Sequence, residues 1–113
     1  MKTFLILFKT GSIPFSSNKQ ADYIKEWSNY INELRASERL KDCSFLKKDG
    51  AFISGKNIEL RSYIPHKDIF SGFMIIKANN IKEAVEICKD CPVFERNGDI
   101  QVKEIDREYL DLK

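Results

Sequence analysis

The histidine at position 66, which is the only one in the chain, is the first residue to consider for acid–base chemistry. An unperturbed imidazole has a pKa of about 6.5, so it changes charge near neutral pH. Asp68 stands two residues further on, where its carboxylate could orient the ring of a general base. We interpret His66 and Asp68 as the candidate catalytic pair, with Trp27 and Tyr63 as candidate ligand-binding side chains. The alternative is a histidine in a polar loop without a function.

Cys88 and Cys91 form a Cys-x-x-Cys motif, whose possible chemistry is thiol redox or metal binding. A redox motif needs its thiolate at the N-terminus of a helix, where the helix dipole lowers the thiol pKa. Here the motif closes an expected helix and has Asp90 beside it, and both features disfavour a thiolate. Zinc would need two more ligands, and only Cys43 and His66 remain for that role. We therefore expect neither a redox couple nor a metal site, and no cofactor is indicated.

Five basic residues cluster in the middle third of the chain, with aromatic residues among them. We interpret the cluster as a solvated edge, because lysines along an edge strand discourage aggregation between sheets. An anionic ligand or a single strand of nucleic acid is the alternative, since both are bound by mixed basic and aromatic side chains. The residues are Lys47, Lys48, Lys56, Arg61 and Lys67, interleaved with Phe45, Phe52 and Tyr63.

The composition is that of one globular domain spanning residues 1–113. Apolar residues make up 42% and charged residues 32%, which excludes wholesale disorder, collagen and coiled coils. The net charge of +2 is too small an excess to indicate a nucleic-acid partner. Three cysteines, an odd and low number, suggest a reducing compartment. The apolar run of residues 4–8 is shorter than a signal-peptide core of about 7–15 residues, so we expect a cytoplasmic protein without a membrane partner.

Two amphipathic helices are expected to cover a sheet. The first runs from about residue 19 to 40. The second runs from about 80 to 90, with Asn79 or Asn80 as its cap and Pro92 as its stop. Apolar residues at spacings of three and four define a buried stripe on each helix. The stripes are Ile24, Trp27, Ile31 and Leu34 in the first helix, and Ile81, Ala84, Val85 and Cys88 in the second.

Two kinds of strand are expected. Residues 3–8 and 72–78 are strongly apolar, which is typical of buried strands, whereas 58–63 and 100–105 alternate between apolar and polar. The order of elements predicts an α+β fold, the ferredoxin-like β-α-β-β-α-β sandwich, with the apolar strands central and the mixed strands at the edges. Two helices can cover only one face of such a sheet. The other face would expose apolar side chains, so we expect it to pair with the same face of a second copy, as a homodimer.

A run of residues in the second half of the chain carries a family resemblance. The pattern resembles the YCII-related proteins, also called the DGPF family, in the dimeric α/β-barrel superfamily. Over residues 1–64 the resemblance rests on the apolar first strand and the helix that holds Trp27. The matching residues are Gly72-Phe73-Met74-Ile75-Ile76-Lys77-Ala78-Asn79-Asn80-Ile81-Lys82-Glu83-Ala84-Val85-Glu86, then Cys91-Pro92, and then Gly98-Asp99-Ile100-Gln101-Val102-Lys103-Glu104-Ile105.

The resemblance implies a ferredoxin-like protomer that pairs through its open sheet face into a dimeric α/β barrel. It also implies a small cleft between the sheet and its loops. We therefore expect a protein that binds or acts on a small organic molecule in that cleft, with Trp27, Tyr63, His66 and Asp68 around it. The alternative is a non-catalytic dimeric module with a structural or regulatory role, whose cleft would be filled.

The sequence departs from the motifs of the family at two places. Some members are proposed to use a His–Asp pair in the cleft, and others carry Asp-Gly-Pro-Phe before the Gly-Phe strand. Alignment on Gly72-Phe73 puts Leu60-Arg61-Ser62-Tyr63 where Asp-Gly-Pro-Phe would fall, so that Asp is lost. The loop after the first strand contains no His either, where the His of the pair usually lies. The chemistry of other members therefore does not transfer residue by residue.

Overall fold

The computed structural model describes residues 1–9, 17–47, 49–62 and 71–106 of the chain. Strands, helices and one short 3-10 helix (η1) follow one another within these ranges. The elements are β1 (Lys2–Lys9), α1 (Ser17–Ala36), β2 (Leu40–Phe45), β3 (Asp49–Ser54), β4 (Asn57–Ser62), β5 (Gly72–Ala78), α2 (Ile81–Cys88), η1 (Pro92–Arg96) and β6 (Asp99–Glu104).

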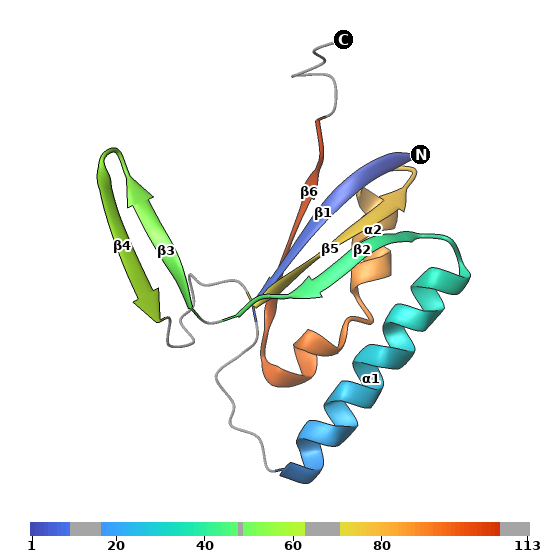
Figure 1. Cartoon of the computed structure of the whole chain (residues 1–113). Helices are drawn as coiled ribbons and strands as arrows, with labels where there is room; N and C mark the ends of the chain where they lie inside the picture. Colours follow the sequence, from blue (N-terminus) through green and yellow to red (C-terminus); the bar gives the residue numbers. More distant parts are fainter. Residues whose placement is uncertain (10–16, 48, 63–70, 107–113) are drawn as a thin grey trace.

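The described strands form a main sheet with the order β2-β5-β1-β6, in which neighbouring strands are antiparallel. β1 and β5 are central, as their continuous apolar sequences predicted. α1 and α2 lie together on one side of this sheet (Figure 1). The arrangement is an α+β fold with an antiparallel sheet, and its strand order is compatible with the ferredoxin-like prediction.

The edge strand next to β5 differs from the prediction. It is β2, residues Leu40–Phe45, and not the segment 58–63. The helix before it ends at Ala36, where Glu38 adopts a left-handed conformation with φ of 59° and turns the chain toward the sheet. A register shift between Leu40 and Asp42 interrupts the alternation along β2. The prediction was wrong here because a β-bulge hides the period of two by which a strand is recognised.

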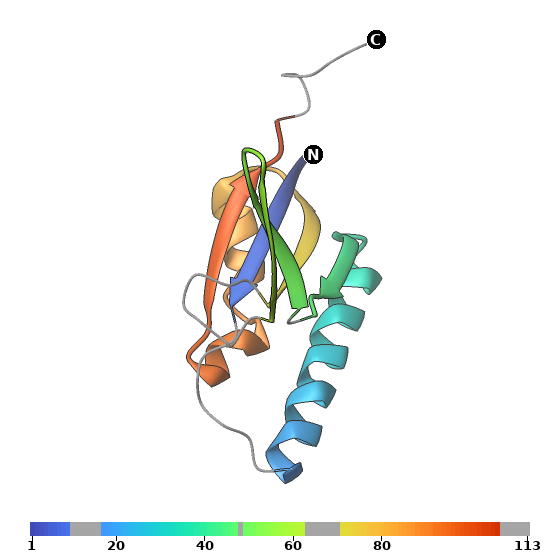
Figure 2. The ribbon, with the colours of Figure 1, turned by 60° about the vertical axis from the view of Figure 1, so that its left-hand side comes forward.

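The predicted strand at 58–63 instead forms a hairpin. β4 pairs with β3 in a separate two-stranded sheet, and Gly55, with φ of 60°, and Lys56 make the turn between them. A left-handed φ carries little steric cost for glycine, which has no Cβ. The hairpin stands away from the main sheet, on the side opposite the helices (Figures 1 and 2).

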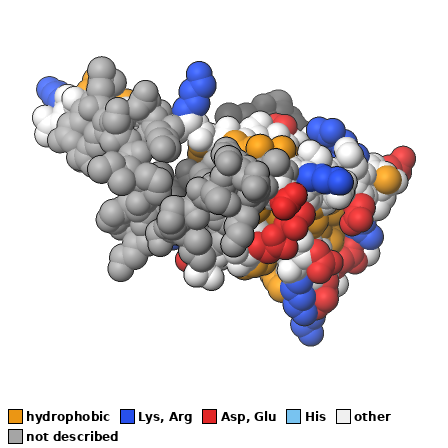
Figure 3. Space-filling model, turned by 90° about the horizontal axis from the view of Figure 1, so that it is seen from below, with side chains coloured by type: hydrophobic (Ala, Val, Ile, Leu, Met, Phe, Trp, Pro, Cys, Tyr) orange, Lys and Arg blue, Asp and Glu red, His pale blue; other side chains and the backbone are white. Residues whose placement is uncertain are grey.

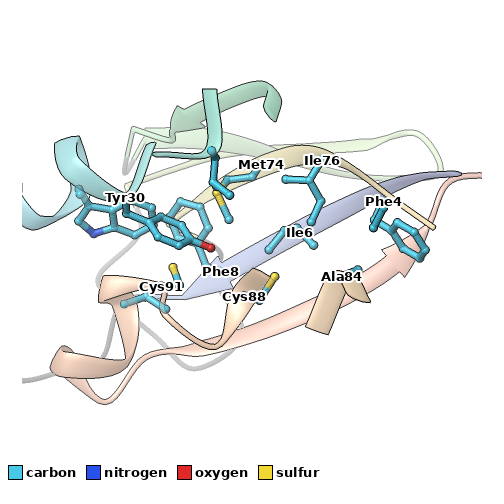
Figure 4. Close-up of a cluster of buried hydrophobic side chains, with 13 residues drawn as sticks. Phe4, Ile6, Phe8, Tyr30, Met74, Ile76, Ala84, Cys88 and Cys91 are labelled. Atoms are coloured by element: carbon cyan, nitrogen blue, oxygen red, sulfur yellow. The ribbon is translucent and has the colours of Figure 1, made fainter. Parts of the chain in front are cut away.

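The core lies between the main sheet and the helices. Alternate residues of β1 and β5 point into it and are fully buried, whereas the residues between them are only partly buried. The Tyr30 hydroxyl donates a hydrogen bond of 2.7 Å to the carbonyl oxygen of Ile87 and so joins α1 to α2. Figure 4 shows the sheet residues and the helix residues converging on this layer. The fully buried sheet residues are Phe4, Ile6, Phe8, Met74, Ile76 and Ala78.

The buried stripes of the helices are partly as expected. Trp27 and Leu34 are buried on α1, but the inward face also includes Tyr23 and Tyr30, so Ile24 lies one residue off that face and is exposed. On α2 the buried residues are Ala84 and Cys88, whereas Ile81 and Val85 are exposed. The small side chain of Ala84 lets this short helix approach the sheet along one narrow face, so residues to either side of that face stay in solvent. No helix in the described part of the chain is both long enough and apolar enough to cross a membrane.

Candidate functional site

Five aromatic side chains gather where β1 and β2 end and α1 passes over them. Trp27 is the centre: its ring centroid lies 4.9 Å from that of Phe8 and 5.1 Å from that of Phe45. On α1, Tyr23 and Tyr30 stand one turn before and after it, with centroid distances of 6.3 and 6.1 Å. Most of these pairs are edge-to-face, the arrangement that the quadrupole of the rings favours. The cluster is therefore a rigid aromatic wall.

The strand register explains how the two phenylalanines reach Trp27. Phe8 is paired with Gly72 on β5, and Gly72 is paired in turn with Phe45 on β2. A Cβ at position 72 would stand only 2.5 Å from Cζ of Phe8 and 2.6 Å from the backbone oxygen of Ser44. Because Gly72 has no side chain, the Phe8 ring can lie across β5 and contact Phe45 at a centroid distance of 5.5 Å.

One wall of this cluster is open to solvent. Trp27 is only 4% exposed, whereas Phe45 at the rim is 57% exposed. An exposed aromatic ring that leads to buried ones is the composition of a small-molecule site, which is largely apolar with a few polar groups. The exposed ring of Phe45 therefore offers an apolar surface at the edge of a buried aromatic cluster.

A buried polar atom accompanies the rings. Nε1 of Trp27 has no hydrogen-bond partner among the described residues. A buried donor without an acceptor costs about 1–3 kcal/mol, so it needs an explanation. An acceptor supplied by a bound molecule would satisfy the indole N–H.

Glu26 has an unusual environment. Its pKa is raised above the ordinary value by a hydrogen bond with the Glu95 side chain, by burial, and by the negative charges of Glu95 and Asp22. Seen from below, acidic side chains gather beside apolar surface on the underside of the molecule, where α1 begins and η1 lies (Figure 3). Two carboxylates held together favour a shared proton, which is why the pKa of Glu26 rises.

The structure places one of the four predicted site residues. Trp27 lies in the aromatic cluster, whereas Tyr63, His66 and Asp68 fall outside the described residues. Sequence reasoning missed Phe8, Phe45 and Glu26 as members of this site. The two phenylalanines could have been predicted from the pairing of each with Gly72. That pairing can be inferred only when β2 is recognised as a strand.

The two cysteines of the Cys-x-x-Cys motif lie in the core. Cys88 and Cys91 are both buried and free, as predicted for Cys88. Burial raises the pKa of Cys88 to about 11 and that of Cys91 to about 12. Both thiols are therefore protonated at neutral pH, which disfavours their use as nucleophiles.

A comparison with protein families identifies the relatives of this fold. The model of the YCII-related domain matches residues 4–107 and so includes every element from β1 to β6. The chain belongs to the YCII-related family. The family match confirms the resemblance that the motifs from Gly72 to Ile105 carried. No curated protein matches the sequence.

Proposed function

We propose that this YCII-related protein binds a small organic molecule at the aromatic cluster. The observation that carries the proposal is the buried indole N–H of Trp27, which lacks an acceptor beside the solvent-exposed ring of Phe45. The ligand class that fits has a flat apolar body to stack on Phe45 and an acceptor atom to receive the Trp27 hydrogen bond. The carboxyl of Glu26, whose pKa is raised mainly by its neighbour Glu95, adds a second polar contact for such a molecule.

We propose further that His66 and Asp68 are the reacting pair of the site, with Tyr63 beside the ligand. Their segment leads into β5, and the backbone N–H of Ser71 donates a hydrogen bond of 2.8 Å to the carbonyl oxygen of Phe8. His66 is six positions before Gly72, and an extended chain of six residues reaches at most about 20 Å. The imidazole is thus within reach of the cluster. As a general base it would take a proton from the ligand while Asp68 orients the ring.

We propose a homodimer through the open face of the main sheet. Leu5 and Leu7 on β1 are paired directly with Ile75 and Phe73 on β5, and all four are partly exposed on the side away from the helices. Exposed polar residues flank this centre on the two edge strands: Asp42 and Ser44 on β2, and Gln101 and Lys103 on β6. An apolar centre within a polar rim is the anatomy of a protein interface.

A thermal-shift screen of small aromatic acids and amides tests ligand binding, because a molecule that binds only the folded chain raises the melting temperature. Trp27 is the sole tryptophan, so its fluorescence then reports each hit in a titration of the wild-type protein. Trp27→Phe retains an aromatic ring and removes the N–H. We expect it to weaken a hit by about tenfold, as the loss of one hydrogen bond predicts. Ile24→Ala, an exposed change on the same helix, is the matched control.

The outcomes separate binding from catalysis. Hits that stabilise the wild-type protein and Trp27→Phe equally contradict the proposed site, and a screen without hits favours the non-catalytic dimeric module. His66→Ala tests the reacting pair once a hit is known. Loss of turnover with an unchanged melting temperature supports the role of His66, and unchanged turnover assigns His66 to the loop alone.

A further inference from the structure

The β3–β4 hairpin carries apolar side chains in solvent on one of its faces. Ile53 is paired with Ile58 across the hairpin, and the two side chains are 64% and 65% exposed. Ala51 lies two residues before Ile53, hence on the same face, and it is exposed as well. Ser54 and Asn57, the next pair toward the turn, lie on the opposite face. The hairpin is therefore a ribbon with an apolar side that nothing in the described chain covers.

A ribbon of this kind needs a surface to pack against. β3 and β4 pair only with each other within the described residues. The hairpin is set apart from the main sheet in Figure 1, and it is seen in front of the sheet in Figure 2. A two-stranded hairpin is at best marginally stable in water, and it becomes stable when its apolar face is buried. No other described element of the chain packs on this apolar face.

The direction of the hairpin indicates which molecule that is. It leaves the body shortly after β2 ends, and it lies on the side of the sheet away from α1 and α2 (Figure 1). This is the side of the open face, with Leu5, Leu7, Phe73 and Ile75, through which we proposed the homodimer. A second copy seated on that face would therefore lie next to the hairpin.

We infer that the β3–β4 hairpin is a dimerisation arm, which buries Ala51, Ile53 and Ile58 against a second copy of this chain. The inference rests on the proposed homodimer and goes beyond it, because it assigns part of the interface to a segment outside the main sheet. In a twofold dimer both arms engage at once, so each chain gives an arm to its partner and receives one.

The area of the interface supports the arm. The main sheet has four strands, and strands of about six residues, spaced about 4.8 Å apart, cover roughly 400 Å² in plan. A stable dimer of standard size buries about 800 Å² on each partner. A face of the two-stranded hairpin adds roughly 200 Å², and the partner's arm covers a similar area in return. The two arms together therefore add an area comparable in plan with that of the main sheet.

Sedimentation of the full-length chain tests the arm with a matched pair of variants. Ile53→Asp puts a charge on the apolar face of the hairpin, and Ser54→Asp puts the same charge one residue further on the opposite face. We expect Ile53→Asp to raise the dimer dissociation constant at least a hundredfold, and Ser54→Asp to change it less than threefold. Equal dissociation constants for Ile53→Asp, Ser54→Asp and the wild-type protein would overturn the arm while leaving the homodimer intact. A wild-type protein that stays monomeric at 100 µM would overturn both.

Hydrogen exchange on the wild-type protein gives a second readout that does not depend on a variant. The amides of β3 and β4 should exchange slowly above the dimer dissociation constant and quickly below it. This result would support the arm even if Ile53→Asp disturbed the hairpin itself. Exchange in the hairpin that is independent of protein concentration would mean that a second copy of the chain does not bury its apolar face, and the inference would then be wrong.

Discussion

Trp27 shows how one side chain combines a structural role with a proposed functional role. Its ring contacts Phe8, Phe45 and two tyrosines, which accounts for its burial in the core. A phenylalanine could make the same kind of contacts without burying an N–H that has no acceptor among the described residues. The presence of an indole in place of a phenyl ring is therefore the residue-level argument for a ligand that accepts this hydrogen bond.

The buried thiols of Cys88 and Cys91 predict that the protein becomes less stable in alkali. Folding raises their pKa values from about 9 to about 11 and about 12, so the unfolded chain loses these protons first as the pH rises. Their contribution to stability is complete below pH 9 and is lost as the pH rises toward the folded values. The free energy of unfolding should fall by about 1.4 kcal/mol per pH unit for each thiol in this window.

Urea unfolding at pH 7.5 to 10.5 measures this dependence. Cys88→Ala lowers stability at every pH because it leaves a small cavity, but its loss of stability with pH should be shallower than that of the wild-type protein. Parallel curves would contradict the assignment of the pH dependence to the thiols. In the same preparation, native Cys88 should react slowly with iodoacetamide at pH 7 and quickly in urea.

At the scale of elements, local signals predicted α2 and missed β2. The cap of α2 is Asn80, whose side-chain oxygen accepts a hydrogen bond of 2.9 Å from the backbone N–H of Glu83. Asn80 is one of the two residues that the sequence predicted for this position. The strand β2 had no such signal. Its sequence, Leu-Lys-Asp-Cys-Ser-Phe, alternates only over its last four residues because the register shifts after Leu40, and its pairing with β5 is what identifies it as a strand.

The cap of α2 offers a test at this scale. Asn80→Ala removes the acceptor for the N–H of Glu83 and should lower the free energy of unfolding by about 1 kcal/mol. Asn79→Ala is the matched control, because Asn79 donates a hydrogen bond of 3.0 Å to the Glu83 carboxylate at an exposed position. It should cost at most about half as much, since water replaces an exposed contact. Equal losses in the free energy of unfolding for the two variants would show that the capping hydrogen bond of Asn80 stabilises the protein no more than the exposed contact of Asn79.

At the scale of the whole molecule, the main sheet has a covered face and an open face. Helices bury the alternate residues of β1 and β5 completely on one side, and the residues between them remain partly exposed on the other. Adjacent residues of one strand therefore have different roles: one packs in the core of the protomer, and its neighbour faces the open side of the sheet.

Ile75 and Ile76 separate the two faces. Ile76 is fully buried against the helices, so Ile76→Asp should unfold the protomer, because an unpaired charge cannot be buried in an apolar core. Ile75 is on the open face and only partly buried, so Ile75→Asp should yield a folded monomer. Light scattering of the wild-type protein at micromolar concentration should give twice the chain mass of 13.2 kDa. A wild-type mass near that of a single chain would contradict the homodimer.

Sequence alone determined the central strands, the presence of the two helices and the family, and it reduced the cap of α2 to Asn79 or Asn80. These features follow from short-range patterns: continuous apolar runs, helical spacing, capping chemistry and the motif from Gly72 to Ile105. It also singled out Trp27, because a tryptophan on an apolar helical stripe must face the sheet.

Only the tertiary structure decided the rest. The choice of Leu40–Phe45 as the edge strand, the release of 58–62 into a hairpin, and the meeting of Phe8, Phe45 and Trp27 all depend on which strands pair. Strand pairing joins residues that are distant in the chain, and a bulge interrupts the local period of two by which a strand is predicted. The aromatic cluster and the extended hairpin are consequences of that pairing, and no short window of the sequence contains them.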